Sequence, residues 1–104
     1  MTRTRLRPRV LNRRTMLPEE IAGSVHVGRP TIWSNPHYIG FCRRCRRVHD
    51  RAQSIAMFRR YLLQKPELLA RVRHELRGMN LICWCAPLPC HADVLLELAN
   101  ADVY

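Results

Sequence analysis

Residues 81–93 constrain the fold of this chain more than any other segment does. They join an apolar run, a loop with two prolines and a segment of helical apolar periodicity. A continuous apolar run such as 81–85 is typical of a strand that is buried on both faces of a sheet. The periodicity that begins near His91 predicts a helix. A strand, a loop and a helix in this order form the commonest anion or nucleotide site of α/β proteins.

The rest of the chain supplies partner elements for this unit. The alternating, β-branched residues 25–27 predict a second strand, and residues 10–11 predict the start of a short one. Helices are expected from near Asp50 and, after a break, from Pro66, since proline suits the first turn of a helix. Their order predicts a small α/β domain, a βαβα-type unit with a short, mainly parallel sheet and a right-handed crossover.

The length of 104 residues is that of one domain with a single modest core. We expect a flexible basic arm over residues 1–9, where arginines alternate with other residues, and one α/β domain over residues 10–104. No apolar run approaches the ~18 residues of a membrane span, and the N-terminus lacks the apolar core of a signal peptide. We therefore expect a cytoplasmic protein with no membrane partner and with reduced thiols.

The net charge of +10 favours a partner that carries phosphate. All but one of the 18 basic residues are arginines, which suits a GC-rich genome as well as a binding function, and they are scattered along the chain. The densest group, within residues 42–51, is interpreted as a solvated loop that leads into a helix. Nucleic acid bound through the basic arm is the alternative to a small phosphate-bearing ligand.

The carboxyl ends of the two main predicted strands should meet at one edge of the sheet, where parallel α/β units bind ligands. After the first strand, Gly28 would allow a ligand to approach the backbone, and Arg29 offers a planar fork for phosphate. Trp33 could stack on a base, and Asn35 could hydrogen-bond to its edge. The alternative, weighted equally, is a structural turn whose tryptophan fills the core. Arg51, at a predicted helix start, could also reach this edge.

The second of these strands leads to Cys90 and His91 at the start of the last predicted helix. Free N–H groups at a helix start carry a positive partial charge, so His91 is a candidate contact for phosphate. If the protein is an enzyme, Cys90 is the candidate nucleophile, because the pKa of a thiol falls at a helix N-terminus. His91 is then the candidate general acid or base.

The same residues could hold a metal ion instead. Cys83 and Cys85 share one face of a strand, and Cys90 or His91 could complete a tetrahedral zinc site. The competing interpretation treats such cysteines as small apolar core residues. The Cys-x-x-Cys segment at 42–45 also has ligand spacing, but no second such pair follows it. Zinc is therefore an alternative, and no cofactor is firmly predicted.

Two motifs of the chain are specific in combination. They read Val-Gly-Arg-Pro-Thr-x-Trp-x-Asn-Pro at 27–36 and Leu-x-Cys-Trp-Cys-x-Pro-x-x-Cys-His-Ala-Asp at 81–93. In these motifs, and in Arg51, Tyr61 and residues 76–78, the chain resembles an uncharacterised "domain of unknown function" family. That family is carried by many bacteriophages and some bacteria.

The resemblance extends from about Arg13 onward and implies a small cytoplasmic α/β domain of phage or prophage origin, with no settled activity. Three features depart from the family pattern. Residues 16–17 stand where relatives have a Trp-Arg pair, and Ser34 replaces a glycine. The Cys-x-x-Cys pair at 42–45 is not part of the signature, so a metal site that used this pair would be particular to this chain.

We therefore expect a phage-type accessory protein in the cytoplasm of its bacterial host. It would bind a small phosphate-bearing ligand, a nucleotide or a nucleotide-derived signal or metabolite, and either sequester it or turn it over. The first alternative is a zinc-stabilised module that binds nucleic acid. The second is a domain that inhibits a host enzyme through protein contacts. Whether the protein is an enzyme is left open.

Overall fold

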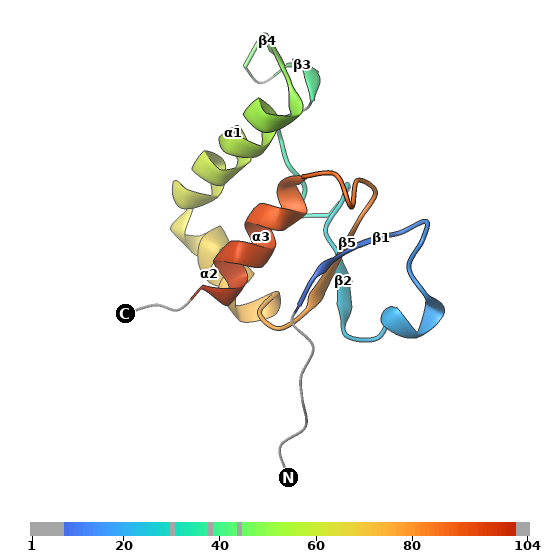
Figure 1. The fold of residues 1–104 in the computed structure, drawn as a ribbon. Coiled ribbons are helices and arrows are strands. Elements are labelled where there is room, and N and C mark those ends of the chain that lie inside the picture. Colours follow the sequence, from blue (N-terminus) through green and yellow to red (C-terminus); the bar gives the residue numbers. More distant parts are fainter. Residues whose placement is uncertain (1–7, 30, 38, 44, 102–104) are drawn as a thin grey trace.

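A parallel sheet forms the centre of the molecule, as given by a computed structural model that describes residues 8–29, 31–37, 39–43 and 45–101. Its strands are β1 (Val10–Asn12), β2 (Ser24–His26) and β5 (Asn80–Cys83). They lie in the order β1-β5-β2, and both outer strands run parallel to β5. The predicted α/β fold with a short parallel sheet is therefore confirmed (Figure 1).

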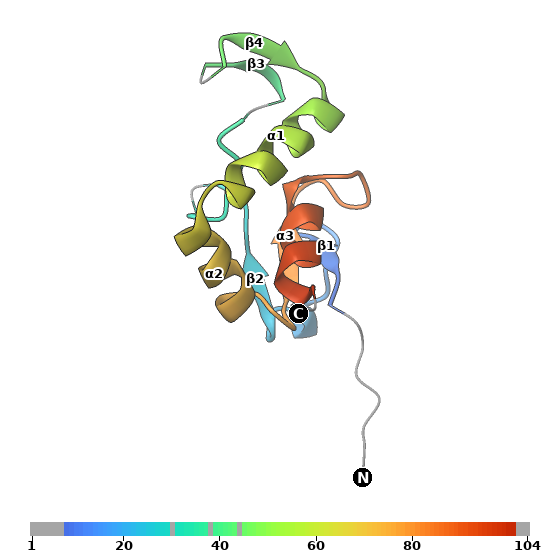
Figure 2. The ribbon, with the colours of Figure 1, turned by 90° about the vertical axis from the view of Figure 1, so that its left-hand side faces the viewer.

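Three helices gather on one side of this sheet (Figures 1 and 2). They are α1 (Arg51–Leu63), α2 (Pro66–Glu75) and α3 (His91–Asn100). α3 lies against β5 and β1, and both α1 and α2 contact α3. Across the described ranges, no helix has the length and the apolar character needed to cross a bilayer.

The helix boundaries follow from local side-chain chemistry. The Asp50 carboxylate accepts a hydrogen bond from the Gln53 backbone N–H (2.7 Å), and the Gln53 side chain accepts one from the Asp50 N–H (2.9 Å). This reciprocal cap fixes the start of α1. Pro66 occupies the first turn of α2, as predicted. Gly78 ends the turn after α2 with a φ of 79°, which glycine adopts without strain.

One apolar core fills the space between the sheet and the helices. Leu81 and Cys83 of β5 belong to it, and Ile82 is buried on the opposite face of the sheet. The predicted burial of this strand on both faces is therefore confirmed. Side chains from the loops and helices complete the core, among them Val27, Trp33, Phe58, Leu62, Val72, Leu76, Val94 and Leu95.

A two-stranded antiparallel sheet lies beyond the start of α1, away from the parallel sheet (Figures 1 and 2). β3 (Gly40–Cys42) pairs with β4 (Arg47–His49), and Phe41 lies opposite Val48. The segment 42–51 is largely exposed and leads into a helix, as predicted, but it forms part of a hairpin where a loop was expected. The turn closes because the Arg46 N–H donates to the Cys42 carbonyl (2.7 Å), with Arg46 in the left-handed region at a φ of 60°.

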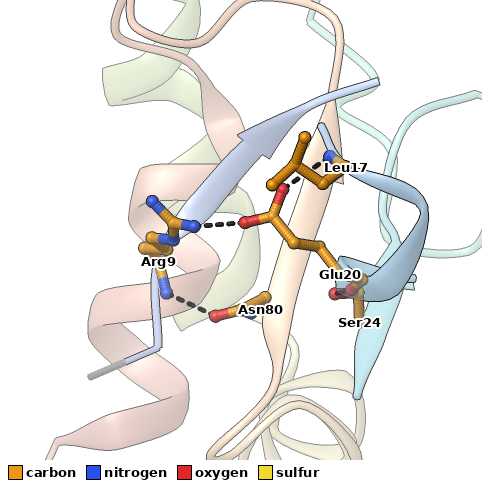
Figure 3. A network of polar contacts seen from close by, with 5 residues as sticks. All are labelled: Arg9, Leu17, Glu20, Ser24 and Asn80. Carbon is orange, nitrogen blue, oxygen red and sulfur yellow. Dashed lines mark hydrogen bonds and ion pairs between the residues drawn. The ribbon is translucent and has the colours of Figure 1, made fainter. Parts of the chain in front are cut away.

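The beginning of β1 is attached to its neighbours by Arg9 (Figure 3). The Arg9 N–H donates to the Asn80 side chain (3.0 Å), and the Arg9 carbonyl accepts from the Leu81 N–H (3.0 Å). The Arg9 guanidinium also forms an ion pair with Glu20, in the short 3-10 helix η1 (Pro18–Glu20). Arg9 therefore belongs to the folded domain and not to the predicted arm. Residues 1–7 of that arm lie outside the described residues.

Candidate functional site

A cavity of about 460 Å³ lies where β2 and β5 end. The loop after β2 forms one wall, the loop from β5 to α3 forms another, and the first turns of α1 form a third. Seven of the residues singled out in the sequence line this cavity: Gly28, Arg29, Asn35, Cys83, Cys85, Cys90 and His91. The two motif segments, far apart in the sequence, therefore meet at the carboxyl edge of the sheet.

Gly28 and Arg29 form the part of the wall that follows β2. A Cβ atom at Gly28 would lie 3.1 Å from the His26 ring, so glycine avoids a tight contact here. Nη2 of Arg29 donates to the Asn35 carbonyl (2.8 Å), which holds the guanidinium in the cavity wall. A guanidinium has five N–H donors in one plane and can serve several acceptors.

Asn35 is used inside the protein. Its Nδ2 donates to the carbonyl and the hydroxyl of Ser54 (3.1 and 3.0 Å), and its Oδ1 accepts from the His37 N–H (2.8 Å). The amide therefore joins the loop after β2 to α1. Both amide hydrogens are occupied by Ser54, so the donor that would recognise a base edge is already engaged.

Trp33 and Arg51 do not line the cavity. Trp33 is 6% exposed and packs in the apolar core, with the Arg71 guanidinium 5.6 Å from the centre of its ring. The stacking role proposed for Trp33 is thus corrected to the alternative, in which this ring fills the core. Nη1 of Arg51 donates to the Pro89 carbonyl (2.9 Å), which attaches the start of α1 to the loop before α3.

His91 lies in the cavity wall as a neutral side chain. Its Nε2 is 2.8 Å from the Val27 carbonyl, so Nε2 carries the proton and donates. The ring packs edge-on against Phe58, with 5.2 Å between the ring centres. Burial lowers the pKa of His91, and the nearby Arg29 lowers it further. Nδ1 then carries a lone pair, so His91 is better suited to accept a proton than to contact phosphate.

The lowered pKa of His91 predicts a loss of stability in acid. Because the folded state disfavours the imidazolium form, the unfolded chain binds this proton more tightly. The free energy of unfolding should therefore fall as the pH drops below the ordinary histidine pKa of about 6.5. Urea unfolding from neutral pH to about pH 5 checks this, and the fall should be smaller in His91→Gln. An equal fall in both proteins would contradict the assignment.

Cys83 and Cys90 form a pair of close thiols at the cavity. Their sulfur atoms are 3.4 Å apart, and the Cys90 S–H donates to Cys83 Sγ. This hydrogen bond, helped by the backbone N–H groups of Cys85 and Ala86, lowers the pKa of the Cys83 thiol to about 6. The same hydrogen bond, together with burial, raises the pKa of Cys90. The thiol that the geometry activates is therefore Cys83, whereas the sequence had suggested Cys90.

A second group of polar side chains lies at the β3–β4 hairpin. His37, Cys42, Cys45 and His49 each offer one ligand atom, and these atoms all lie within 4.8 Å of one another. The ligand spacing of the two cysteines was recognised in the sequence, but the histidines on either side of them were not. A Cys-x-x-Cys pair with a histidine before and after it was the signal that could have found this group.

The sequence suggested a different set of metal ligands, and their ligand atoms do not gather around one point as those of the hairpin group do. This set consists of Cys83, Cys85, Cys90 and His91. His91 directs Nε2 to the Val27 carbonyl, so this nitrogen is engaged inside the protein and does not join the three thiols. Across the part of the chain that the structure describes, the hairpin group alone brings three or more such ligand atoms close together. The candidate metal centre is therefore moved from the cavity to the hairpin.

These features define the protein as a small α/β domain with a cavity at the carboxyl edge of a parallel sheet. Residues 10–101 match the family described as "Domain of unknown function (DUF4326)", and the chain belongs to this family. The chain is also similar to an "Uncharacterized 12.4 kDa protein in nrdA-td intergenic region" of Enterobacteria phage T4. The two are 30% identical over 79 residues, which cover 73% of this chain and 67% of the phage protein. No solved structure matches the chain.

Proposed function

We propose that this protein is a phage-type accessory protein that binds a small phosphate-bearing ligand in the cavity. The observation that supports this proposal is the convergence of the loop at Gly28 and Arg29 with the loop from Cys83 to His91. The carboxyl edge of a parallel sheet is the usual ligand site of α/β proteins. A volume of about 460 Å³ is within the range of small-molecule sites and suits a ligand of nucleotide size.

Arg29 is the residue that we assign to the phosphate. Its planar fork matches phosphate oxygens, and it lines the cavity beside the start of α3. The first turn of α3 adds a positive partial charge. The net charge of +10 raises the local concentration of anionic ligands around the whole molecule.

The cavity also contains groups that could react with a bound ligand. The lowered pKa of Cys83 makes its thiolate available near neutral pH, and His91 is neutral and can accept a proton. Turnover by covalent catalysis would use the Cys83 sulfur as the nucleophile, whereas sequestration would not. A Cys83→Ser variant that retains the ligand but forms no product would assign the protein to turnover.

The test begins with mass spectrometry of the small molecules released when the purified full chain is denatured. Binding of the compounds found, or of a nucleotide panel, is then measured by calorimetry. Arg29→Gln should weaken binding about 10- to 100-fold, because hydrogen bonds to charged groups contribute roughly 1.5–3 kcal/mol.

Arg59→Gln is the matched control, because it also removes one positive charge. Arg59 lies on α1, forms an ion pair with Glu97 and does not line the cavity. The affinity of this variant should stay close to that of the unmodified chain. Equal weakening by the two substitutions would show a general charge effect and would overturn the assignment of Arg29. Failure of every phosphate-bearing compound to bind would overturn the proposal.

The exposed face of the hairpin favours a second candidate function, the binding of single-stranded nucleic acid. Phe41 and Val48 are 59% and 72% exposed, and Arg43, Arg46 and Arg47 are exposed beside them. An exposed aromatic ring among arginines combines base stacking with phosphate contacts. Oligonucleotide binding that falls steeply with salt and weakens in Phe41→Ala would support this function. Binding that is unchanged in Phe41→Ala would count against it.

A further inference from the structure

Two side chains of the β3–β4 hairpin are buried, and both are potential metal ligands. Successive side chains of a strand point to opposite faces, so Phe41 and Val48 share the outer face of the hairpin. Cys42 and His49 point inward, at 0% and 8% exposed. An isolated two-stranded hairpin is at best marginally stable in water. This hairpin therefore needs another source of stability.

The distances within the group suit a single ion. Nδ1 of His37 lies 3.2 Å from Sγ of Cys45 and 3.8 Å from Sγ of Cys42. Nitrogen and sulfur ligands of one tetrahedral zinc ion are about 3.3 to 3.8 Å apart, given metal–ligand bonds of about 2.0–2.3 Å. The rings of His37 and His49 are 6.3 Å apart between centres, and none of the five cysteines forms a disulfide.

His49 adds an independent observation. Its Nε2 atom is buried and has no hydrogen-bond partner within the described part of the chain. Buried polar atoms in native proteins nearly always have a partner, and an exception points to an ion or a water molecule at that place. This nitrogen belongs to one of the four side chains whose ligand atoms lie together.

We propose that His37, Cys42, Cys45 and His49 bind one zinc ion. Two sulfur and two nitrogen ligands are a donor set typical of structural zinc sites, which are closed and four-coordinate. Two thiolates balance the charge of the ion, so the site needs no further anion. The ion takes the place of an apolar core beneath the hairpin and fixes the hairpin to the segment before it.

The metal site shares His37 with the wall of the cavity. His37 lines the cavity, and its N–H and carbonyl are held by Asn35 and Ser54. Zinc binding therefore fixes the position of this part of the wall. This role of zinc is structural and is separate from the reactive groups at Cys83 and His91. The zinc proposal is therefore tested independently of the proposed ligand.

The test uses the full chain without a polyhistidine tag, purified without chelators, with zinc measured by inductively coupled plasma mass spectrometry. We expect about one zinc per chain, given one four-ligand site. Cys45→Ser should lose the zinc, and Cys45→His should retain it because it restores a ligand. Cys85→Ser is the matched control, since Cys85 is a half-buried cysteine at the cavity, and this variant should retain one zinc.

Cobalt substitution provides a second measurement that does not depend on the stability of a variant. The chain stripped of metal and titrated with Co²⁺ should develop the visible bands of tetrahedral thiolate coordination, and Zn²⁺ should remove them. Chelation should lower the melting temperature of the unmodified chain and of Cys85→Ser. Absence of zinc and of cobalt bands in the unmodified chain would overturn the proposal. Loss of zinc in Cys85→Ser with retention in Cys45→Ser would overturn it as well.

Discussion

Replacement of Phe58 by alanine is expected to destabilise the protein by about 3–5 kcal/mol, the usual effect of deleting a buried aromatic ring. Phe58 is 1% exposed, at the centre of the core between α1 and α3. It stacks on Tyr61 and meets the His91 ring edge-on, so the substitution removes contacts on two sides. Small domains have unfolding free energies of about 5–15 kcal/mol, so much of the stability would be lost.

Leu63→Ala is the control for this experiment. Leu63 lies on the same helix but is 55% exposed, so its truncation should change the unfolding free energy by only about 0.5 kcal/mol. Both values come from urea unfolding at one pH. Because Phe58 also shields His91, the pKa of His91 measured by NMR should rise toward its ordinary value in Phe58→Ala. Similar destabilisation by the two substitutions would show that Phe58 is not a central core residue.

Asn35→Ala is expected to destabilise the protein by about 2–4 kcal/mol, because it leaves more than one buried polar group without its partner. The His37 N–H loses the Asn35 oxygen, and the Ser54 carbonyl loses the Asn35 N–H. All three residues are buried, so water cannot easily replace the lost hydrogen bonds. Urea unfolding measures the loss, and hydrogen exchange should show faster exchange of the His37 amide.

Ser34→Ala provides the comparison, since Ser34 is the neighbouring residue and its hydroxyl donates to the Thr31 carbonyl in its own turn. This substitution should destabilise the protein by about 1 kcal/mol or less. If Asn35→Ala were no more destabilising than Ser34→Ala, the interior role of the Asn35 amide would be wrong. The assignment of Asn35 to a ligand would then have to be reconsidered.

The parallel sheet and the helices could be predicted because they depend on apolar patterns and local signals. Residues 81–85 were predicted as a strand from a continuous apolar run, and the observed strand covers Asn80–Cys83. The start of α1 was predicted from the polar residue Asp50 before an apolar stripe. The hairpin could not be predicted in this way. Its inward side chains, Cys42 and His49, are polar or weakly apolar, so the alternation that identifies a strand is missing.

The chemistry of the candidate sites was harder to predict, because it depends on which atoms face one another. The proximity of Cys83 and Cys90 followed from the strand–loop–helix order. Which of the two thiols donates the hydrogen bond depends on atomic positions and could not be predicted. A tryptophan can fill a core or stack on a base, and only the burial of Trp33 in the structure decides between these two roles. The Cys-x-x-Cys pair was correctly noted, and its histidine partners were missed because one lies before the hairpin and the other ends it.

The position of β5 in the sheet has a consequence for the newly made chain. Among the strands that the structure describes, β1 and β2 do not pair with each other, and each pairs with β5, which is synthesised much later. A nascent chain on the ribosome therefore contains both outer strands without the template that joins them. Assembly of the sheet has to wait until residues 80–83 leave the exit tunnel, after both outer strands and the helices α1 and α2 have been made.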